Sequence, residues 1–273
     1  AQPPVSAESA ALKRDLARVQ AELLSRGLLR TDGGAADAPW TADQLAETFL
    51  RLALYDEYAQ TGAGLVARQT ASHLRRWEDP VRVAVRFGAS VPPDRQAADR
   101  ARLASYLGRL AGVTGHPVSL VETGANFVVQ IVNEDERRAL APEVNRHLPG
   151  LTPSQVAGIT EMPRNTYCLV YALSSGTSGR YTRAMAVIRA EHPDLMRLGC
   201  IHEEIAQGLG LANDSPHARP SIFNDDEEFA LLTPMDEVML RMLYSPLLRP
   251  GMTEAEARPI VHALARGLMG EGS

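Results

Sequence analysis

The hydrophobic pattern changes its period near Pro80, and this change constrains the fold more than any other feature. Before it, apolar residues recur every three or four positions, as from Leu12 to Leu23, which indicates amphipathic helices. After it, apolar and polar residues alternate over 81–87, which indicates a half-buried strand. We therefore expect an α+β chain with a helical N-terminal region over residues 1–78 and a second region that contains both strands and helices over residues 79–273.

Capping and turn signals divide the chain further. Gly27 is expected to end the first helix, and Thr41 with Gln44 forms a capping box that starts the second; Gly62 and Gly64 then break the helical pattern. Strands are expected at 81–87, 118–122, 127–132, 166–173 and 181–189. Further helices are expected at 94–110 and 193–209, and two more start at Thr233 and Thr253.

Charge and hydropathy argue against a nucleic-acid partner and against a transmembrane segment. The net charge is −5 with a pI of about 5.8, so the concentrated basic face of a nucleic-acid-binding protein is not expected. No apolar run reaches the roughly 18 residues that span a bilayer, so no transmembrane segment is expected. The first residues, Ala1-Gln2-Pro3-Pro4, resemble a trimmed mature end.

Cys168 and Cys200 are the two cysteines of the chain. In an exported protein they can pair as a disulfide, and in a cytosolic protein they are more often buried thiols. The sequence does not give the distance between them, so both alternatives stay open.

One segment has a spacing that points to a site. Glu203 and Gln207 are four residues apart, so both project from one face of a helix, and Glu204 lies beside them. Gly210 follows at a position where the helix can end in a conformation that glycine adopts easily. Asn213 can then swing back, so that the polar side chains converge at the end of the helix.

This spacing resembles the metzincin zinc peptidases, whose motif is His-Glu-x-x-His-x-x-Gly-x-x-His. Glu203, Gln207 and Asn213 stand at the histidine positions, Glu204 at the position of the catalytic glutamate, and Gly210 at the turn glycine. The resemblance implies that Glu204 is the candidate general base and that the other three polar residues bind substrate or water.

The resemblance continues downstream. Ser221-Ile222-Phe223 falls where these peptidases place a methionine turn, although no methionine is present, and residues 232–236 resemble the start of their closing helix. Through Ser221-Ile222-Phe223-Asn224-Asp225 and Leu247-Leu248-Arg249-Pro250-Gly251-Met252-Thr253, residues 80 to 265 are also similar to the bacterial domain of unknown function 2927. That similarity implies a zincin-like mixed sheet with an active-site helix, in an exported or lipid-attached protein with no established activity. We expect a periplasmic or secreted protein whose signal peptide has been removed, and structural roles for Gly210, Phe223, Cys168 and Cys200.

The departures from the motif decide the expected metal content. One carboxylate and two neutral amides replace three imidazoles, and amide oxygens are poor ligands for zinc. We therefore expect no zinc and no cofactor. The alternative is a calcium or magnesium ion, for which Glu203, Gln207, Asn213 and Asp214 are the candidate ligands.

Several residues keep two interpretations. Glu204 can be a general base or a buried acid, and a neighbouring carboxylate should raise the pKa of one of the pair. Gln207 and Asn213 can orient substrate or can lock the helix to the following loop. His202 precedes the motif, and we favour a hydrogen-bonded structural residue over a metal ligand there.

Charged residues outside this segment also have two interpretations. Arg183 and Arg189, on the predicted strand 181–189, can face a bound peptide if that strand is a sheet edge, or can be ordinary edge charges. Residues 225–228 form an acidic run that can bind calcium or a basic partner, and we favour a solvated loop. The methionines at 235, 239 and 242 are expected in the core.

Two functions follow as hypotheses. The first is a pseudopeptidase that binds a peptide or protein in an extended cleft without cleaving it. The second is an atypical peptidase or hydrolase that uses Glu204 as its base, with or without a metal other than zinc. The sequence does not choose among roles for the N-terminal helices and does not give the oligomeric state.

Overall fold

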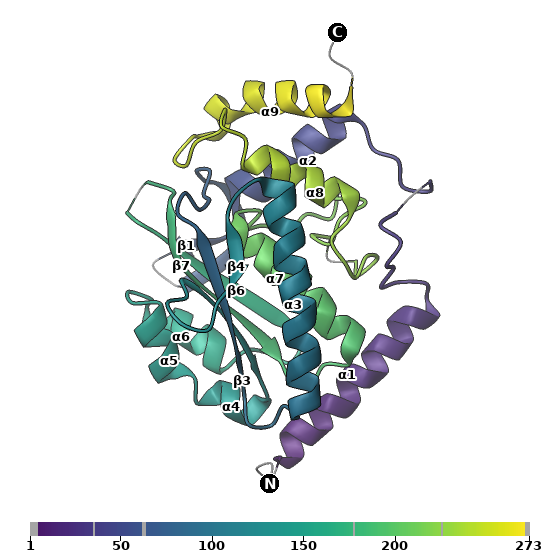
Figure 1. Cartoon of the computed structure of the whole chain (residues 1–273), viewed down its shortest axis with the longest axis vertical. Helices are drawn as coiled ribbons and strands as arrows, with labels where there is room; N and C mark the ends of the chain where they lie inside the picture. The colour runs from purple at the N-terminus through teal and green to yellow at the C-terminus, as the bar shows by residue number, and fades with distance from the viewer. Residues whose placement is uncertain (1–4, 35, 62–63, 177, 225, 271–273) are drawn as a thin grey trace.

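The computed structural model describes residues 5–34, 36–61, 64–176, 178–224 and 226–270, with the side chains of 56–71 excepted. Figure 1 shows a sheet with helices on both of its faces. In chain order the elements are α1 (Ala7–Ser25), α2 (Ala42–Leu54), β1 (Tyr55–Thr61), β2 (Gly64–Ala71), β3 (Val81–Phe87), α3 (Pro93–Thr114), β4 (Val118–Leu120), β5 (Phe127–Val132), α4 (Glu134–Arg138), α5 (Ala141–His147), α6 (Pro153–Thr160), β6 (Cys168–Ser174), β7 (Tyr181–Arg189), α7 (Asp194–Leu209), α8 (Pro234–Leu243) and α9 (Glu254–Met269).

The two N-terminal helices lie where the hydrophobic spacing predicts them. Leu12, Leu16 and Leu23 are the buried leucines of α1, which pack against the start of α7. The predicted capping box at α2 is present, because Thr41 accepts from the backbone N–H of Gln44 and the Gln44 side chain returns a bond to Thr41.

The expectation of a purely helical N-terminal region is wrong in its second half. β1 and β2 pair as antiparallel strands, and Gly64, one of the two glycines that break the helical pattern, is the first residue of β2. Gly62 lies outside the described residues. In addition, α2 packs against α9, and the two helices lie together at the top of Figure 1. The first part of the chain therefore packs against the last part.

The main sheet has five strands in the order β4-β3-β5-β7-β6. β3 is parallel to both of its neighbours, β5 is parallel to β7, and β6 alone runs antiparallel, beside β7. The chain thus has the mixed sheet expected from its sequence, with α7 following directly after β7.

Alternation along β7 separates the two faces of the sheet. Ala184, Ala186 and Ile188 face the larger core, which also contains the buried faces of α3, α7 and α8. Met185 and Val187 face a smaller core formed with α5 and α6. In Figure 1 α3 crosses one face of the sheet, and α5 and α6 lie on the opposite side.

Three short helices, α4 to α6, were not expected from the sequence. Two of them begin with capping boxes, Asn133 with Glu136 and Thr152 with Gln155. Each helix has at most eight residues, which is too short for a hydrophobic period to stand out.

The last two helices start at the residues that the sequence predicts. Thr233 and Thr253 each cap a helix through a reciprocal bond with the residue three positions on. Met235, Met239 and Met242 are fully buried in the core, as expected. Among the helices of the described residues, none is both long enough and apolar enough to cross a bilayer.

Candidate functional site

Helix α7 carries the candidate site, and its end is fixed by side chains from distant elements. Trp77 Nε1 donates a 2.8 Å hydrogen bond to the carbonyl oxygen of Gly208, and the Tyr244 hydroxyl donates a 3.0 Å bond to that of Leu209. The last carbonyls of a helix have no partner within the helix. Trp77 and Tyr244 supply partners for two of these carbonyls. They thereby fix the end of α7, one turn after Glu203 and Glu204.

Gly210 ends the helix in a conformation that requires glycine. Its φ is 133°, and a Cβ atom there would lie 2.3 Å from the carbonyl oxygen of Arg75. Both facts exclude a side chain. The chain can therefore turn sharply after Leu209, as the sequence predicts.

Glu203 and Glu204 lie next to the disulfide. A carboxylate oxygen of each and the Sγ atom of Cys168 all lie within 4.8 Å of one another. Glu203 is half-buried, whereas Glu204 is only 3% exposed. The two adjacent glutamates therefore have different access to solvent at one place in the fold.

Burial raises the pKa of Glu204 well above its usual value, and the nearby carboxylate of Asp214 raises it further. The Oε2 atom of Glu204 is buried and has no hydrogen-bond partner among the described residues. A neutral, protonated Glu204 is the form that this environment favours.

Gln207 and Asn213 are both engaged in hydrogen bonds. Gln207 Nε2 donates to Asp214 Oδ1 at 2.9 Å. Asn213 donates twice to the end of α2: its Nδ2 atom to the Arg51 carbonyl oxygen and its backbone N–H to that of Leu52, each at 3.1 Å. The structure thus brings Gln207, Asp214 and Glu204 together, and it ties Asn213 to α2.

The residues at the three histidine positions of the motif do not fit zinc. Gln207 and Asn213 use their amide nitrogens as donors, which leaves only neutral amide oxygens as ligands. Such oxygens suit calcium or magnesium better than zinc. A calcium or magnesium ion at these residues stays a prediction.

His202 is part of the core. Its ring stacks on Tyr106 with 3.9 Å between centroids, and its Nδ1 atom accepts a 3.2 Å bond from the backbone N–H of Leu232. Burial lowers the pKa of His202 to about 3, so the ring is neutral. These contacts agree with the structural interpretation.

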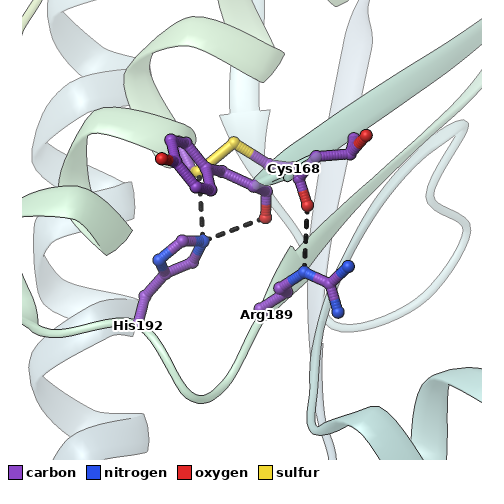
Figure 2. Close-up of a disulfide and its surroundings, with 6 residues drawn as sticks. Cys168, Arg189 and His192 are labelled. Atoms are coloured by element: carbon purple, nitrogen blue, oxygen red, sulfur yellow. Dashed lines mark hydrogen bonds between the residues drawn. A yellow bond between two sulfur atoms is a disulfide. The ribbon is translucent and has the colours of Figure 1, made fainter. Parts of the chain in front are cut away.

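The two cysteines form a disulfide between Cys168 at the start of β6 and Cys200 in α7. Figure 2 shows the imidazole of His192 directed at this bridge. Its Nε2 atom lies 2.9 Å from the carbonyl oxygen of Tyr167 and 3.8 Å from Cys200 Sγ. Burial lowers the pKa of His192 to about 4, so a neutral ring donates to that carbonyl. The spacing of the sequence gave no signal for this histidine.

A small pocket with a cavity volume of about 60 Å³ opens beside the disulfide. Both cysteines and Glu203 line it, and Glu227 adds a second carboxylate. The described part of its wall contains no arginine, lysine or histidine. The remaining described lining residues are Leu29, Tyr167, Leu195, Met196, Gly199, Ile222, Asn224, Phe229 and Ala230.

The strand 181–189 is not a sheet edge, which corrects one expectation. β7 pairs with β5 on one side and with β6 on the other, so β6 is the edge strand. Arg183 is exposed, but Arg189 is buried at 1% exposure and forms a 2.6 Å ion pair with Glu134. Its Nε atom also donates a 3.0 Å hydrogen bond to the carbonyl oxygen of Thr166, which is a dashed line at Arg189 in Figure 2. Arg189 therefore cannot face a bound chain.

The acidic run after the site is divided between different surroundings. Asp225 lies outside the described residues, and Asp226 is exposed. Glu228 pairs with Arg30 and Arg219. Ser221 and Phe223, where the peptidases have a methionine turn, are both buried, and Ser221 donates to Asp236 at 2.5 Å.

Comparison with known proteins gives one match. A family model described as "Protein of unknown function (DUF2927)" matches residues 42–263, which is most of the chain. No curated protein matches, and no solved structure matches.

Proposed function

Because the chain belongs to this family of unknown function, we propose a function from its own geometry: it binds an extended peptide or protein segment along the edge strand β6. In this proposal the chain is an exported, zincin-like pseudopeptidase. The mixed sheet that leads into α7 supports the zincin-like assignment, and the disulfide supports export to an oxidising compartment.

The open outer side of β6 carries the proposal. The backbone N–H of Ala184 bonds to Asn126, so the even-numbered residues of β7 direct their backbone groups at β5 and the odd-numbered ones at β6. The β6 residues opposite these odd-numbered residues complete the ladder of backbone hydrogen bonds between the two strands; they are Leu169, Tyr171 and Leu173. The N–H and C=O groups of Cys168, Val170 and Ala172 therefore point outward, and no hydrogen bond to them is found among the described residues.

The side chains of β6 also suit a binding edge. All seven residues of Cys168–Ser174 are half-buried, and none is charged. Natural edge strands that avoid pairing usually carry lysine, proline or a bulge. β6 has neither lysine nor proline, and its one register shift lies at its end, between Leu173 and Ser174. An uncharged edge with free backbone groups is the template on which an extended segment adds as a further strand.

The pocket beside Cys168 adds side-chain selectivity to this edge. It lies at the start of β6, where Tyr167 and Cys168 enter its wall. Its two glutamates and the absence of a cation from its described lining favour a basic side chain. We therefore propose a segment that pairs with β6 and places an arginine or lysine in the pocket.

Binding without cleavage is the better supported of the two functions. The residues at the metal-ligand positions do not suit zinc, and Asn213 is held by the end of α2. Without a metal, a peptidase of this kind would need another group to activate water.

The hydrolase hypothesis keeps one specific observation in its favour. Glu204 is a buried acid of raised pKa beside a second carboxylate, which is the pairing that general acid and base catalysis uses. A pool of fluorogenic peptides tests it. Cleavage that disappears in Glu204→Gln would support the hydrolase and would contradict the pseudopeptidase.

A displayed library of random peptides tests the binding proposal. An enriched peptide is synthesised, and its affinity is measured by calorimetry for the wild type, Ala172→Pro and Ala172→Ser. Proline at 172 removes an outward N–H and leaves the ladder to β7 intact. We expect Ala172→Pro to bind at least about tenfold more weakly, since one strand-pairing hydrogen bond is lost and the ring obstructs approach.

Ala172→Ser is the matched control, because it keeps the N–H and a small side chain. Circular dichroism and the melting temperature should be the same in all three proteins. Equal affinity of Ala172→Pro and the wild type would contradict pairing along β6. Enriched peptides without a basic residue would contradict the assignment of the pocket.

A further inference from the structure

Three residues with potential metal-ligand side chains share one face of α7. Cys200, Glu203 and Glu204 are at positions i, i+3 and i+4, which share a helix face. Cys168 approaches the same face from β6, and its Sγ atom lies within 4.8 Å of a carboxylate oxygen of each glutamate. Two sulfurs and two carboxylates therefore meet at the junction of one strand and one helix.

We propose that reduction of the Cys168–Cys200 disulfide converts this junction into a binding site for a thiophilic divalent cation such as Zn²⁺. The two thiolates and the carboxylates of Glu203 and Glu204 are the ligands. While the disulfide is intact, each sulfur is bonded to the other and offers no thiolate. The oxidation state of the bridge thus controls whether the cation binds.

The reaction requires a reductant, which is a thiol or a phosphine from outside the protein. With a phosphine, the sulfur–sulfur bond breaks, the phosphine and one water molecule become a phosphine oxide, and each sulfur gains a proton. The cation then displaces the two thiol protons and the proton of Glu204 as it binds, and these protons pass to water. Electrons and protons balance in both steps.

The distances suit one ion. Zinc takes sulfur at about 2.3 Å and carboxylate oxygen at about 2.0–2.2 Å, so any two of its ligand atoms lie within roughly 4.6 Å of each other. The sulfur and two oxygens here lie within 4.8 Å of one another, so small side-chain rotations bring them onto a common centre. Cys200 supplies the fourth ligand, because its Sγ atom is bonded to Cys168 Sγ in the oxidised chain.

A second observation at the site points to a cation. The Oε2 atom of Glu204 is buried, its residue is only 3% exposed, and it has no hydrogen-bond partner among the described residues. A buried polar atom without a partner costs stability. A cation bound between the sulfurs and Glu204 supplies the missing partner.

The pocket gives both reactants access. Cys168, Cys200 and Glu203 all line it, so a small reductant and a hydrated ion reach the bridge from the surface. This site involves neither Gln207 nor Asn213, and it differs from the arrangement of the peptidase motif. It shares Cys168, Cys200 and Glu203 with the pocket proposed for a basic side chain, but cation binding does not require a peptide on β6.

A cobalt titration of the full chain tests the proposal. Co²⁺ replaces Zn²⁺ in such sites and gives a sulfur-to-cobalt absorption band. The oxidised chain should show no such band. After treatment with a water-soluble phosphine, which carries no competing thiol, one Co²⁺ per chain should bind with the band present, and added Zn²⁺ should abolish the band.

Variants separate the proposed ligands from other residues. In the reduced chain, Cys168→Ser should lose the band, and Glu203→Gln and Glu204→Gln should each bind Co²⁺ at least about tenfold more weakly. Glu22→Gln, an exposed residue of α1, is the control and should bind normally. Cobalt bound without a sulfur band, or equal binding by both glutamate variants and the wild type, would overturn the proposal.

Circular dichroism decides the case in which reduction unfolds the chain. Metal binding then contributes to folding, so one equivalent of Co²⁺ should restore the helical signal. A reduced chain that neither binds Co²⁺ nor refolds with it would also overturn the proposal.

Discussion

The side-chain nitrogen of Asn213 donates a 3.1 Å hydrogen bond to the carbonyl oxygen of Arg51, in the last turn of α2. The backbone N–H of Asn213 bonds to Leu52 in the same turn. The residue at the third ligand position of the peptidase motif therefore completes the C-terminal end of a helix that lies outside that motif.

Replacement of Asn213 by alanine should lower the free energy of unfolding by about 1–3 kcal/mol, because it leaves a carbonyl at the end of α2 without its partner. Urea unfolding followed by circular dichroism measures the change. Asn145→Ala, on the exposed face of α5, is the control and should stay within about 0.5 kcal/mol of the wild type. A similarly small change in Asn213→Ala would show that the contact to α2 carries no stability.

Glu204→Gln should change how stability depends on pH. The pKa of Glu204 is raised in the folded chain, so its favourable contribution is complete below the unfolded pKa of about 4.5 and is lost as pH rises through the folded value. The glutamine of the variant does not titrate, so the variant does not lose stability in this way as pH rises. We expect its melting temperature to exceed that of the wild type at pH 8, with the smallest difference near pH 4.

The control for that experiment is Glu22→Gln, which removes an exposed carboxylate from α1. Its melting temperature should follow the wild type at every pH. If the Glu204→Gln curve also runs parallel to the wild type, Glu204 is not the buried acid that the structure places beside Asp214.

Gly210→Ala should destabilise the chain by about 2 kcal/mol or more. Alanine would have to adopt the positive φ of Gly210, which is unfavourable for a residue with a Cβ atom. That Cβ atom would also collide with the carbonyl oxygen of Arg75. Gly112→Ala is the matched control, because Gly112 lies in α3 with open space around it. Alanine there should stabilise the chain by about 0.5–1 kcal/mol. Thermal melts of the two variants should move in opposite directions.

Glu134→Gln should cost about 3–5 kcal/mol, since it removes the negative partner of two buried arginines. Glu134 pairs with Arg189 and Arg137, and both guanidinium groups are 1% exposed. Asp15→Asn, which breaks an exposed pair with Arg18, is the control and should cost less than about 1 kcal/mol. The free energy of unfolding is measured by chemical denaturation. If both variants lower it by the same amount, the ion pairs of Glu134 stabilise the chain no more than an exposed pair does.

Local signals in the sequence predicted the elements well. Thr41, Thr233 and Thr253 each cap a helix through a side chain three residues on, so both partners lie within one turn. The strand from Val81 to Phe87 was predicted because alternation alone marks it. Such contacts depend on neighbours in the sequence, and the sequence displays them directly.

Contacts between distant residues could not be predicted in the same way. Arg189 was expected on a sheet edge, but Glu134, 55 residues earlier, and the position of β6 bury it. Asn213 donates to the end of α2, more than 150 residues away, and the spacing of the motif does not reveal this partner. The spacing of α7 placed the glutamates correctly on one helix, whereas the partners that fix each side chain come from the tertiary fold.

The free backbone groups along β6 have a consequence for handling the purified protein. An edge that accepts a guest strand accepts the same edge of another copy, since backbone pairing does not depend on sequence. At high concentration, chains without a ligand should therefore pair through β6 into dimers, and a short peptide that occupies β6 should keep them apart.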